Sequence, residues 1–184
     1  MPDRIVVLDA NVLIPAAPRD TLLRAAERGL YQPRWSDAIL DEVERNLVEN
    51  GLTSADDASD LIAVMRDVFP EALVSEFDDL IDMMPNNPKD RHVLAAAVYA
   101  HADIIVTENL RDFGDDVLAP YAITALSIDE FLVTLWDRSP KAMTHIVREQ
   151  AADLDFPPMT PDELLEVLAS WALTFTSRVR PQLD

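Results

Sequence analysis

The sequence predicts an α/β fold with a central, mostly parallel sheet flanked by helices. Two short runs rich in Ile and Val, at Ile5–Leu8 and Asp103–Thr107, have the composition of buried strands. Helical patterns separate and follow these runs, and strands that alternate with helices are typical of a parallel sheet. In such sheets, binding sites form at the carboxyl ends of the strands.

Start and stop signals mark the other elements of the main domain. Ser36 is suited to cap one helix, Asn87 with Pro88 begins another, and Ser127 with Glu130 forms a capping box. The elements expected are helices at Pro18–Gly29, Asp37–Gly51, Ser54–Phe69 and Asn87–His101, an extended segment at Tyr31–Ser36, a strand around Ile123 and a helix from Ser127.

Ser139-Pro140 marks a domain boundary, so we expect a main domain at residues 1–138 and a helical extension at 139–184. The extension predicts one helix from Pro140 to Leu154 and a second, unbroken helix from Thr160 to Arg178. The second helix is too apolar to face water on all sides and must pack on the main domain, on its partner helix or on another chain. The face expected to be covered holds Leu164, Leu168, Trp171 and Phe175.

Composition narrows the class of protein. The 184 residues include 34 acids and 15 bases, and the net charge of -19 argues against non-specific binding to DNA or to an anionic membrane. This acidic charge suits a basic protein partner. It does not exclude a nuclease, because metal ions and a few local arginines can bind phosphates. The absence of cysteine excludes disulfides, Cys-ligated zinc and thiol nucleophiles. Since no signal peptide or membrane span is predicted, we expect a soluble cytoplasmic protein.

Four carboxylates occur where chemistry could need them. Asp9 ends the first strand between apolar flanks, where an unpaired carboxylate is costly unless a cation or hydrogen bonds compensate for it. Glu42 lies on the helix after Ser36, Asp90 in the first turn of the helix after Asn87, and Asp112 beyond the second strand. Mg²⁺ and Mn²⁺ prefer such oxygen ligands and can activate a water for phosphodiester cleavage.

Each acid also has a structural interpretation. Glu42 could be an ordinary surface charge, Asp90 could complement the helix dipole, and Asp112 could cap a turn. The apolar flanks of Asp9 make it the hardest of the four to explain in this way. Spacing alone therefore leaves the metal site and the structural roles equally open.

The pattern resembles the PIN-domain ribonucleases over roughly residues 4 to 135. The matching pieces are Asp9-Ala10-Asn11 after an apolar strand, Glu42 on a helix that follows Ser36, Asp90 opening a helix rich in small residues, and a strand ending in Thr107. The resemblance implies a three-layer PIN-like fold and endonucleolytic cleavage of RNA with Mg²⁺ or Mn²⁺. Asp9, Glu42, Asp90 and Asp112 would be the catalytic metal ligands.

One piece departs from the family pattern. Many PIN domains have Thr-x-Asp after the last strand, where this chain has Thr107-Glu108-Asn109. The subgroup that it most resembles has Thr-x-Asn followed by an Asp-Phe pair, here Asp112-Phe113, so we assign Asp112 as the fourth acid. Asn109 could instead contribute an amide oxygen or orient a water.

Other polar residues would support this site. With such a site, Asn11 would hold Asp9 or a metal-bound water by hydrogen bonds, and Thr107 could do the same from the second strand. Ser36 and Asn109 are expected just behind the ligands. Three bases flank the acids and could contact RNA phosphates or simply be solvated: Lys89, Arg91 and Arg111. His92 follows Asp90 closely, but no His pair at helical spacing supports a zinc site.

Similar single-domain bacterial proteins are VapC-like toxins of type II toxin–antitoxin systems. The resemblance therefore implies a cognate antitoxin that blocks the site, often within a dimer-based assembly. Two alternatives remain open, namely a housekeeping RNA-processing nuclease without an antitoxin and an inactive PIN-like binding module. A haloacid-dehalogenase-type phosphatase needs a second Asp where Asn11 stands, and a receiver domain needs a late Lys after a strand, which this chain does not have.

Overall fold

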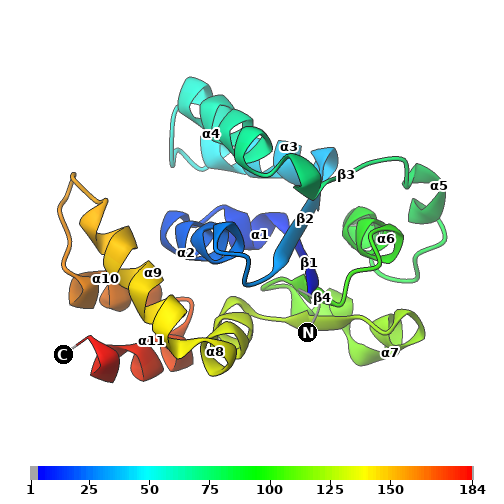
Figure 1. The fold of residues 1–184 in the computed structure, drawn as a ribbon. Helices are drawn as coiled ribbons and strands as arrows, with labels where there is room; N and C mark the ends of the chain where they lie inside the picture. The colour runs from blue at the N-terminus through cyan, green and yellow to red at the C-terminus, as the bar shows by residue number, and fades with distance from the viewer. Residues whose placement is uncertain (1–3, 184) are drawn as a thin grey trace. The chain divides into compact units, whose positions relative to one another are not determined.

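The computed structural model describes residues 4–183 and contains a central sheet of five strands. The strands lie in the order β3-β2-β1-β4-β5, and their pairing is parallel (Figure 1). Their bounds are β1 Ile5–Leu8, β2 Gln32–Ser36, β3 Leu73–Val74, β4 Ile104–Val106 and β5 Thr124–Leu126. The predicted fold class, an α/β fold around a parallel sheet, is confirmed.

The chain divides into two compact units that alternate along the sequence. The first contains the sheet and comprises the residues up to Ile14 together with Tyr31–Ala125, and the second comprises Pro15–Leu30 and the segment that begins at Leu126. Helices of the first unit are α1 Ala10–Leu13, α3 Asp37–Glu49, α4 Ala55–Val68, α5 Asp78–Ile81, α6 Arg91–Tyr99 and α7 Asp115–Leu118. Those of the second are α2 Ala16–Glu27, α8 Ile128–Arg138, α9 Pro140–Ala152, α10 Pro161–Leu168 and α11 Leu173–Val179.

The central strands are buried on both faces, as a parallel sheet covered by helices requires. Val6 to Leu8 and Ile105 to Val106 have no exposed surface. Helix α6 packs on β1, β2 and β4, while α3 packs on β2 and carries α4 on its other side. In the part of the chain that the structure describes, no helix is long and apolar enough to span a membrane.

Side-chain caps fix several helix starts where the sequence predicted them. The Ser36 hydroxyl accepts a hydrogen bond from the Ile39 amide at the start of α3. Complete capping boxes open α8, with Ser127 and Glu130, and α10. Such a residue stabilises the start of a helix, because its side chain accepts a hydrogen bond from an amide that has no partner within the helix.

Four short helices and strands were not predicted from the sequence, namely α1, α5, α7 and β3. Helix α1 is a single turn that begins directly after Asp9, whose side chain accepts a hydrogen bond from the Ala10 amide and so caps the turn. Strand β3 has only two residues and lies at the sheet edge beyond β2, within a strongly acidic stretch. Elements this short carry too few residues to show a periodicity.

The expectation of one unbroken last helix was wrong, because α10 and α11 are separate helices. Ala172 between them has φ −144° and ψ 60°, which is not helical. The Asp129 carboxylate of α8 accepts hydrogen bonds from the Thr174 and Phe175 amides, at 3.1 and 2.8 Å, and so caps α11. Leu164, Leu168 and Phe175 of the predicted face are buried, but Trp171 is 41% exposed, whereas the prediction had covered it.

Helix α2 belongs to the second unit through its contacts with α9 and α10. The buried Thr21 hydroxyl lies 2.7 Å from Gln150 Oε1, and Gln150 Nε2 donates to the Ala17 carbonyl at 2.9 Å. The C-terminal helices therefore pack with α2 and α8, which the sequence placed in the main domain. The domain boundary after residue 138 stays a prediction.

Candidate active site

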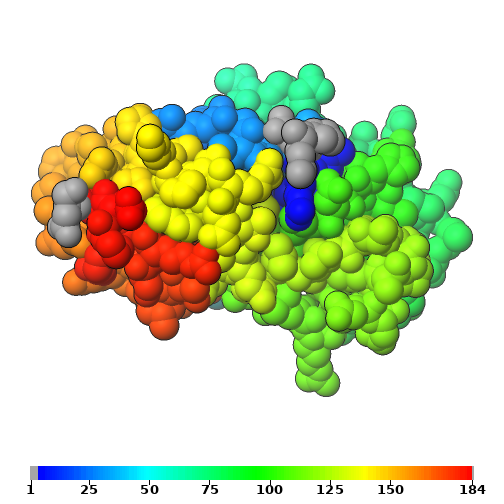
Figure 2. All heavy atoms as spheres, turned by 60° about the horizontal axis from the view of Figure 1, so that its bottom comes forward, coloured from blue at the N-terminus to red at the C-terminus, as the bar shows by residue number. Residues whose placement is uncertain are grey.

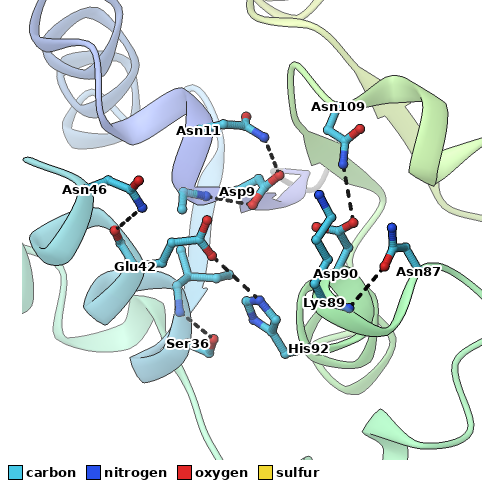
Figure 3. A network of polar contacts seen from close by, with 12 residues as sticks. Asp9, Asn11, Ser36, Glu42, Asn46, Asn87, Lys89, Asp90, His92 and Asn109 are labelled. Atoms are coloured by element: carbon cyan, nitrogen blue, oxygen red, sulfur yellow. Dashed lines mark hydrogen bonds and ion pairs between the residues drawn. The ribbon is translucent and has the colours of Figure 1, made fainter. Parts of the chain in front are cut away.

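The candidate site lies at the carboxyl end of the sheet, where β1 and β4 are parallel neighbours. Asp9 follows β1 and Thr107 follows β4, and the Asp9 amide donates to the Val106 carbonyl at 3.1 Å. Glu42 reaches this edge from α3, and Asp90 reaches it from the one-turn 3₁₀ helix Pro88–Asp90 before α6 (Figure 3).

Asp9 is only 6% exposed, and three hydrogen bonds hold its carboxylate. Oδ1 accepts from the Ala10 amide at 2.8 Å, and Oδ2 accepts from Asn11 Nδ2 and from the Thr107 hydroxyl, each at 2.7 Å. Burial raises the pKa of Asp9, the Thr107 and Ala10 bonds lower it, and the nearby Glu42 charge raises it again. The net effect is a raised pKa, so these bonds do not fully compensate the buried charge, and a cation would.

Asn11 links the loops that follow the two strands. Its Nδ2 lies 3.1 Å from the Thr107 hydroxyl, and its Oδ1 accepts a hydrogen bond from the Glu108 amide at 3.0 Å. The Thr107 hydroxyl in turn accepts from the Asn109 amide at 3.0 Å. Because each side chain is fixed by the others, the Asp9 carboxylate has one defined orientation.

Asp90 and Asp112 form a carboxyl pair beside Asp9. Asp112 lies in the 3₁₀ turn Leu110–Phe113, and Asn109 Nδ2 donates to Asp112 Oδ2 at 2.9 Å and approaches Asp90 Oδ2 at 3.4 Å. Burial raises the pKa of Asp90, and the Asp112 and Asp9 charges add to this shift while Lys89 opposes it. The Asn109 hydrogen bond lowers the pKa of Asp112, so the two neighbouring carboxyls are shifted in opposite directions.

The side chain of Glu42 lies near His92, a contact that was not predicted from the sequence. His92 Nε2 lies 3.9 Å from Glu42 Oε2 (Figure 3). Among the residues that the structure describes, the buried Nδ1 of His92 has no hydrogen-bond partner. The signal available in the sequence was the position of His92 two residues after Asp90, in the same first turn. Ser36 positions Glu42 indirectly, because it caps the start of α3, the helix that carries Glu42.

The three bases at this edge differ in their surroundings. The Lys89 and Arg111 side chains are exposed, and both charges contribute to the lowered pKa of Asp112. Arg91 is half-buried, and its Nε donates to the Asn86 carbonyl at 3.3 Å. Arg91 therefore fixes the turn before α6, while Lys89 and Arg111 face solvent beside the acids.

The donor set fits a hard divalent cation, since it consists of carboxylate and amide oxygens at the end of a sheet. Within residues 4–183, no group of three or more His, Asp or Glu side chains already surrounds a common point. Asn109 Nδ2 instead links Asp90 and Asp112. Asp9 and Asp90 both have raised pKa values, to which the charges of neighbouring acids contribute. A bound cation would remove this mutual repulsion.

Two protein-family models match separate segments of the chain. Residues 5–111 match the family model described as PIN domain. The chain belongs to the PIN-domain family. Residues 128–181 match a second model, described as VapC50 C-terminal domain, so this PIN-domain protein has a C-terminal region of the VapC50 kind.

One curated relative is the "Putative ribonuclease VapC50" of Mycobacterium tuberculosis (strain ATCC 25618 / H37Rv), which is 42% identical over 104 residues. The match covers 56% of this chain and 62% of that protein, so it spans less than two thirds of the relative. No solved structure matches significantly. The family predicted from the sequence motifs is thus confirmed, together with a C-terminal extension.

Proposed function

We propose that this PIN-domain protein is a divalent-metal-dependent endoribonuclease and the toxin of a toxin–antitoxin pair. The observation that carries the proposal is the Asp9 carboxylate, which is buried at the carboxyl end of β1 and held in one orientation by Asn11 and Thr107. The charge of Glu42 acts on Asp9, and the charges of Asp9 and Asp112 act on Asp90. Membership of the PIN family and the name of the relative support the reaction class.

Asp9, Glu42, Asp90 and Asp112 would hold Mg²⁺ or Mn²⁺. Such an ion, when bound, activates a water and stabilises the leaving oxygen of the phosphodiester. The chain's own polar residues prepare the ligands, since Asn11 and Thr107 orient Asp9, and Asn109 holds Asp112 beside Asp90. A bound cation would also offset the Asp112 and Asp9 charges that help to raise the pKa of Asp90.

The exposed basic residues at the carboxyl end of the sheet would contact the RNA. Lys89 and Arg111 can pair with the RNA phosphates next to the acids, where charge-assisted hydrogen bonds are strong. Arg91 is a weaker candidate than the sequence suggested, because its Nε already holds the Asn86 carbonyl.

The antitoxin is proposed on two grounds. The relative carries the VapC name, and a chain of net charge -19 suits a basic protein partner. A housekeeping PIN nuclease in the cytoplasm would have the same site, and a neighbouring small antitoxin-like reading frame would distinguish the two. An inactive binding module is disfavoured by the position of Asp112, which Asn109 Nδ2 links to Asp90 although the chain lacks Thr-x-Asp.

The test is Mn²⁺ titration by calorimetry on the wild type, on Asp9→Asn and on Asp41→Asn. Asp41 is exposed on α3 next to Glu42, so its variant removes one charge without touching the Asp9 network. We expect Asp9→Asn to weaken binding at least tenfold, about 1.4 kcal/mol, and Asp41→Asn to leave it nearly unchanged. RNA cleavage with Mg²⁺ or Mn²⁺ should fall in parallel. Equal Mn²⁺ affinity in all three proteins would make Asp9 a purely structural acid.

A further inference from the structure

A second concave site lies in the C-terminal unit, on helix α9. The cavity has a volume of about 410 Å³, and its lining combines cationic and hydrogen-bonding side chains. The lining residues are Pro140, Lys141, Thr144, His145, Arg148 and Gln182. All except Gln182 come from α9, where the spacing of Lys141, His145 and Arg148 places them on one face. We call this site the α9 pocket.

The C-terminal turn Arg180–Gln182 forms the wall of the α9 pocket. Arg148 Nη2 donates to the Gln182 and Leu183 carbonyls, at 3.1 and 3.3 Å, and so fixes this turn against α9. In Figure 2 the red atoms of the C-terminal segment lie beside the yellow atoms of the α8–α9 region. Thr144 is buried beneath the cations, and its hydroxyl donates to the Pro140 carbonyl. The pocket is therefore built by tertiary contacts.

Positive charge at this pocket contrasts with the net charge of -19 for the chain. Glu149 is the neighbouring acid on α9, and it is engaged twice, by an ion pair with Arg28 and by His145 Nε2 at 3.0 Å. Lys141 is exposed and lines the pocket. The first turn of α9 also contains no acid. Donors are thus available to an anion here.

We propose that the α9 pocket binds the phosphodiester backbone of RNA, as a contact additional to those at the carboxylate edge. The choice of RNA rests on the proposed function. Lys141 and Arg148 supply the charge-assisted donors that phosphate oxygens take up. A flat anionic membrane would approach much of this acidic chain and be repelled by it, whereas a single strand needs to touch only the pocket. Contacts of this kind add affinity without sequence preference.

The experiment is fluorescence anisotropy with labelled single-stranded RNA in EDTA, over a series of salt concentrations. The variants are Lys141→Gln, Lys141→Arg and the matched control Arg4→Gln. Arg4 is exposed just before β1 and does not line the α9 pocket, so its variant removes one positive charge without changing the pocket. Each lost phosphate contact reduces the slope of log K against log salt by about 0.7 for a single strand.

We expect Lys141→Gln to weaken binding several-fold and to reduce the slope by about 0.7, while Lys141→Arg and Arg4→Gln keep the wild-type slope. Equal slopes in all four proteins, or no binding of RNA by the wild type, would overturn the proposal. So would loss of binding to phosphatidylserine vesicles in Lys141→Gln with RNA binding unchanged. Displacement of the RNA by inorganic phosphate at similar concentration in wild type and Lys141→Gln would likewise count against the pocket.

The assay separates this proposal from the nuclease proposal. EDTA suppresses metal-dependent cleavage, so binding is measured whether or not the protein is a nuclease. A slope that depends on Lys141 in a protein that cleaves no RNA would refute the nuclease and keep the pocket. Loss of cleavage in Asp9→Asn would support the nuclease. If the wild type and Lys141→Gln then cleaved long RNA with the same KM, the nuclease proposal would stand and the pocket proposal would be refuted.

Discussion

At the scale of single residues, Thr107 determines how the candidate site is organised. Its hydroxyl donates to Asp9, accepts from the Asn109 amide and lies near the Asn11 amide. The side chain has no exposed surface. One buried hydroxyl thus connects the end of β1 to the loop that carries the fourth acid.

Thr107→Val should be costly, although the two side chains have nearly the same shape. The variant removes one of the two hydrogen bonds to Asp9 Oδ2 and leaves the Asn109 amide without its hydroxyl acceptor. The loss of a buried hydrogen-bond partner costs about 1–3 kcal/mol. Urea denaturation would measure the free energy of unfolding. Thr107→Ser keeps the hydroxyl and should retain most of the stability, and equal losses in Thr107→Val and Thr107→Ser would show that the methyl group is what matters.

The residues that could be predicted from sequence are those that end or begin an element. Asp9 and Thr107 follow strands and Asp90 begins a helix, so topology alone places them at one edge. The contact of His92 with Glu42 depends on how far α3 and α6 extend toward each other, which no local pattern contains. The same is true of Asp112, whose place beside Asp90 depends on the shape of a 3₁₀ turn.

At the scale of elements, capping interactions carry testable pH dependence. In the capping box of α10, Glu163 accepts hydrogen bonds from the Thr160 amide and hydroxyl, at 2.7 and 2.8 Å. The Thr160 backbone bond lowers the pKa of Glu163 below its ordinary value of 4.5. The carboxylate therefore stabilises the fold above pH 4.5, and this contribution is lost as the pH falls through the folded-state pKa.

Glu163→Gln should remove this part of the acid destabilisation. We expect its melting temperature to fall less steeply than that of the wild type between neutral pH and about pH 3. Glu166→Gln is the matched control, since Glu166 is exposed on the same helix and outside the capping box. Parallel curves for wild type and Glu163→Gln would mean that the box does not stabilise the helix.

The elements also show where periodicity fails as a guide. Apolar residues run continuously through the last predicted helix, so the sequence gives no sign of a break. The break at Ala172 is favoured by Asp129, which lies more than forty residues earlier and caps α11 across the fold. A distant carboxylate thus decides a local conformation.

At the scale of the whole molecule, the extension helps to complete a core. Leu165, Leu168 and Phe175 have no exposed surface, and α9 and α11 pack against α2 and α8. Each such buried side chain contributes about 1.5–3 kcal/mol. Removal of the extension would uncover apolar faces on the helices that remain.

Deletion of residues 139–184 should therefore lower the melting temperature by roughly 10 °C or more and reduce solubility. Leu173→Ser is a contrast within the extension, because Leu173 is 65% exposed and its variant should melt like the wild type. A truncated protein as stable and soluble as the full chain would show that the extension is an independent attachment.

The placement of α2 has a consequence for synthesis on the ribosome. Thr21 and Gln150, which hydrogen-bond to each other, are separated by 129 positions in the chain. At about 5–20 residues per second, α2 emerges on the order of ten seconds before its partner α9. During that interval every strand of the sheet has been made, whereas α2 still exposes its apolar face. A protease should then cleave at α2 more readily in nascent chains stalled before α9 than in chains stalled after it. A chaperone that protects the apolar face of α2 would act only within that interval.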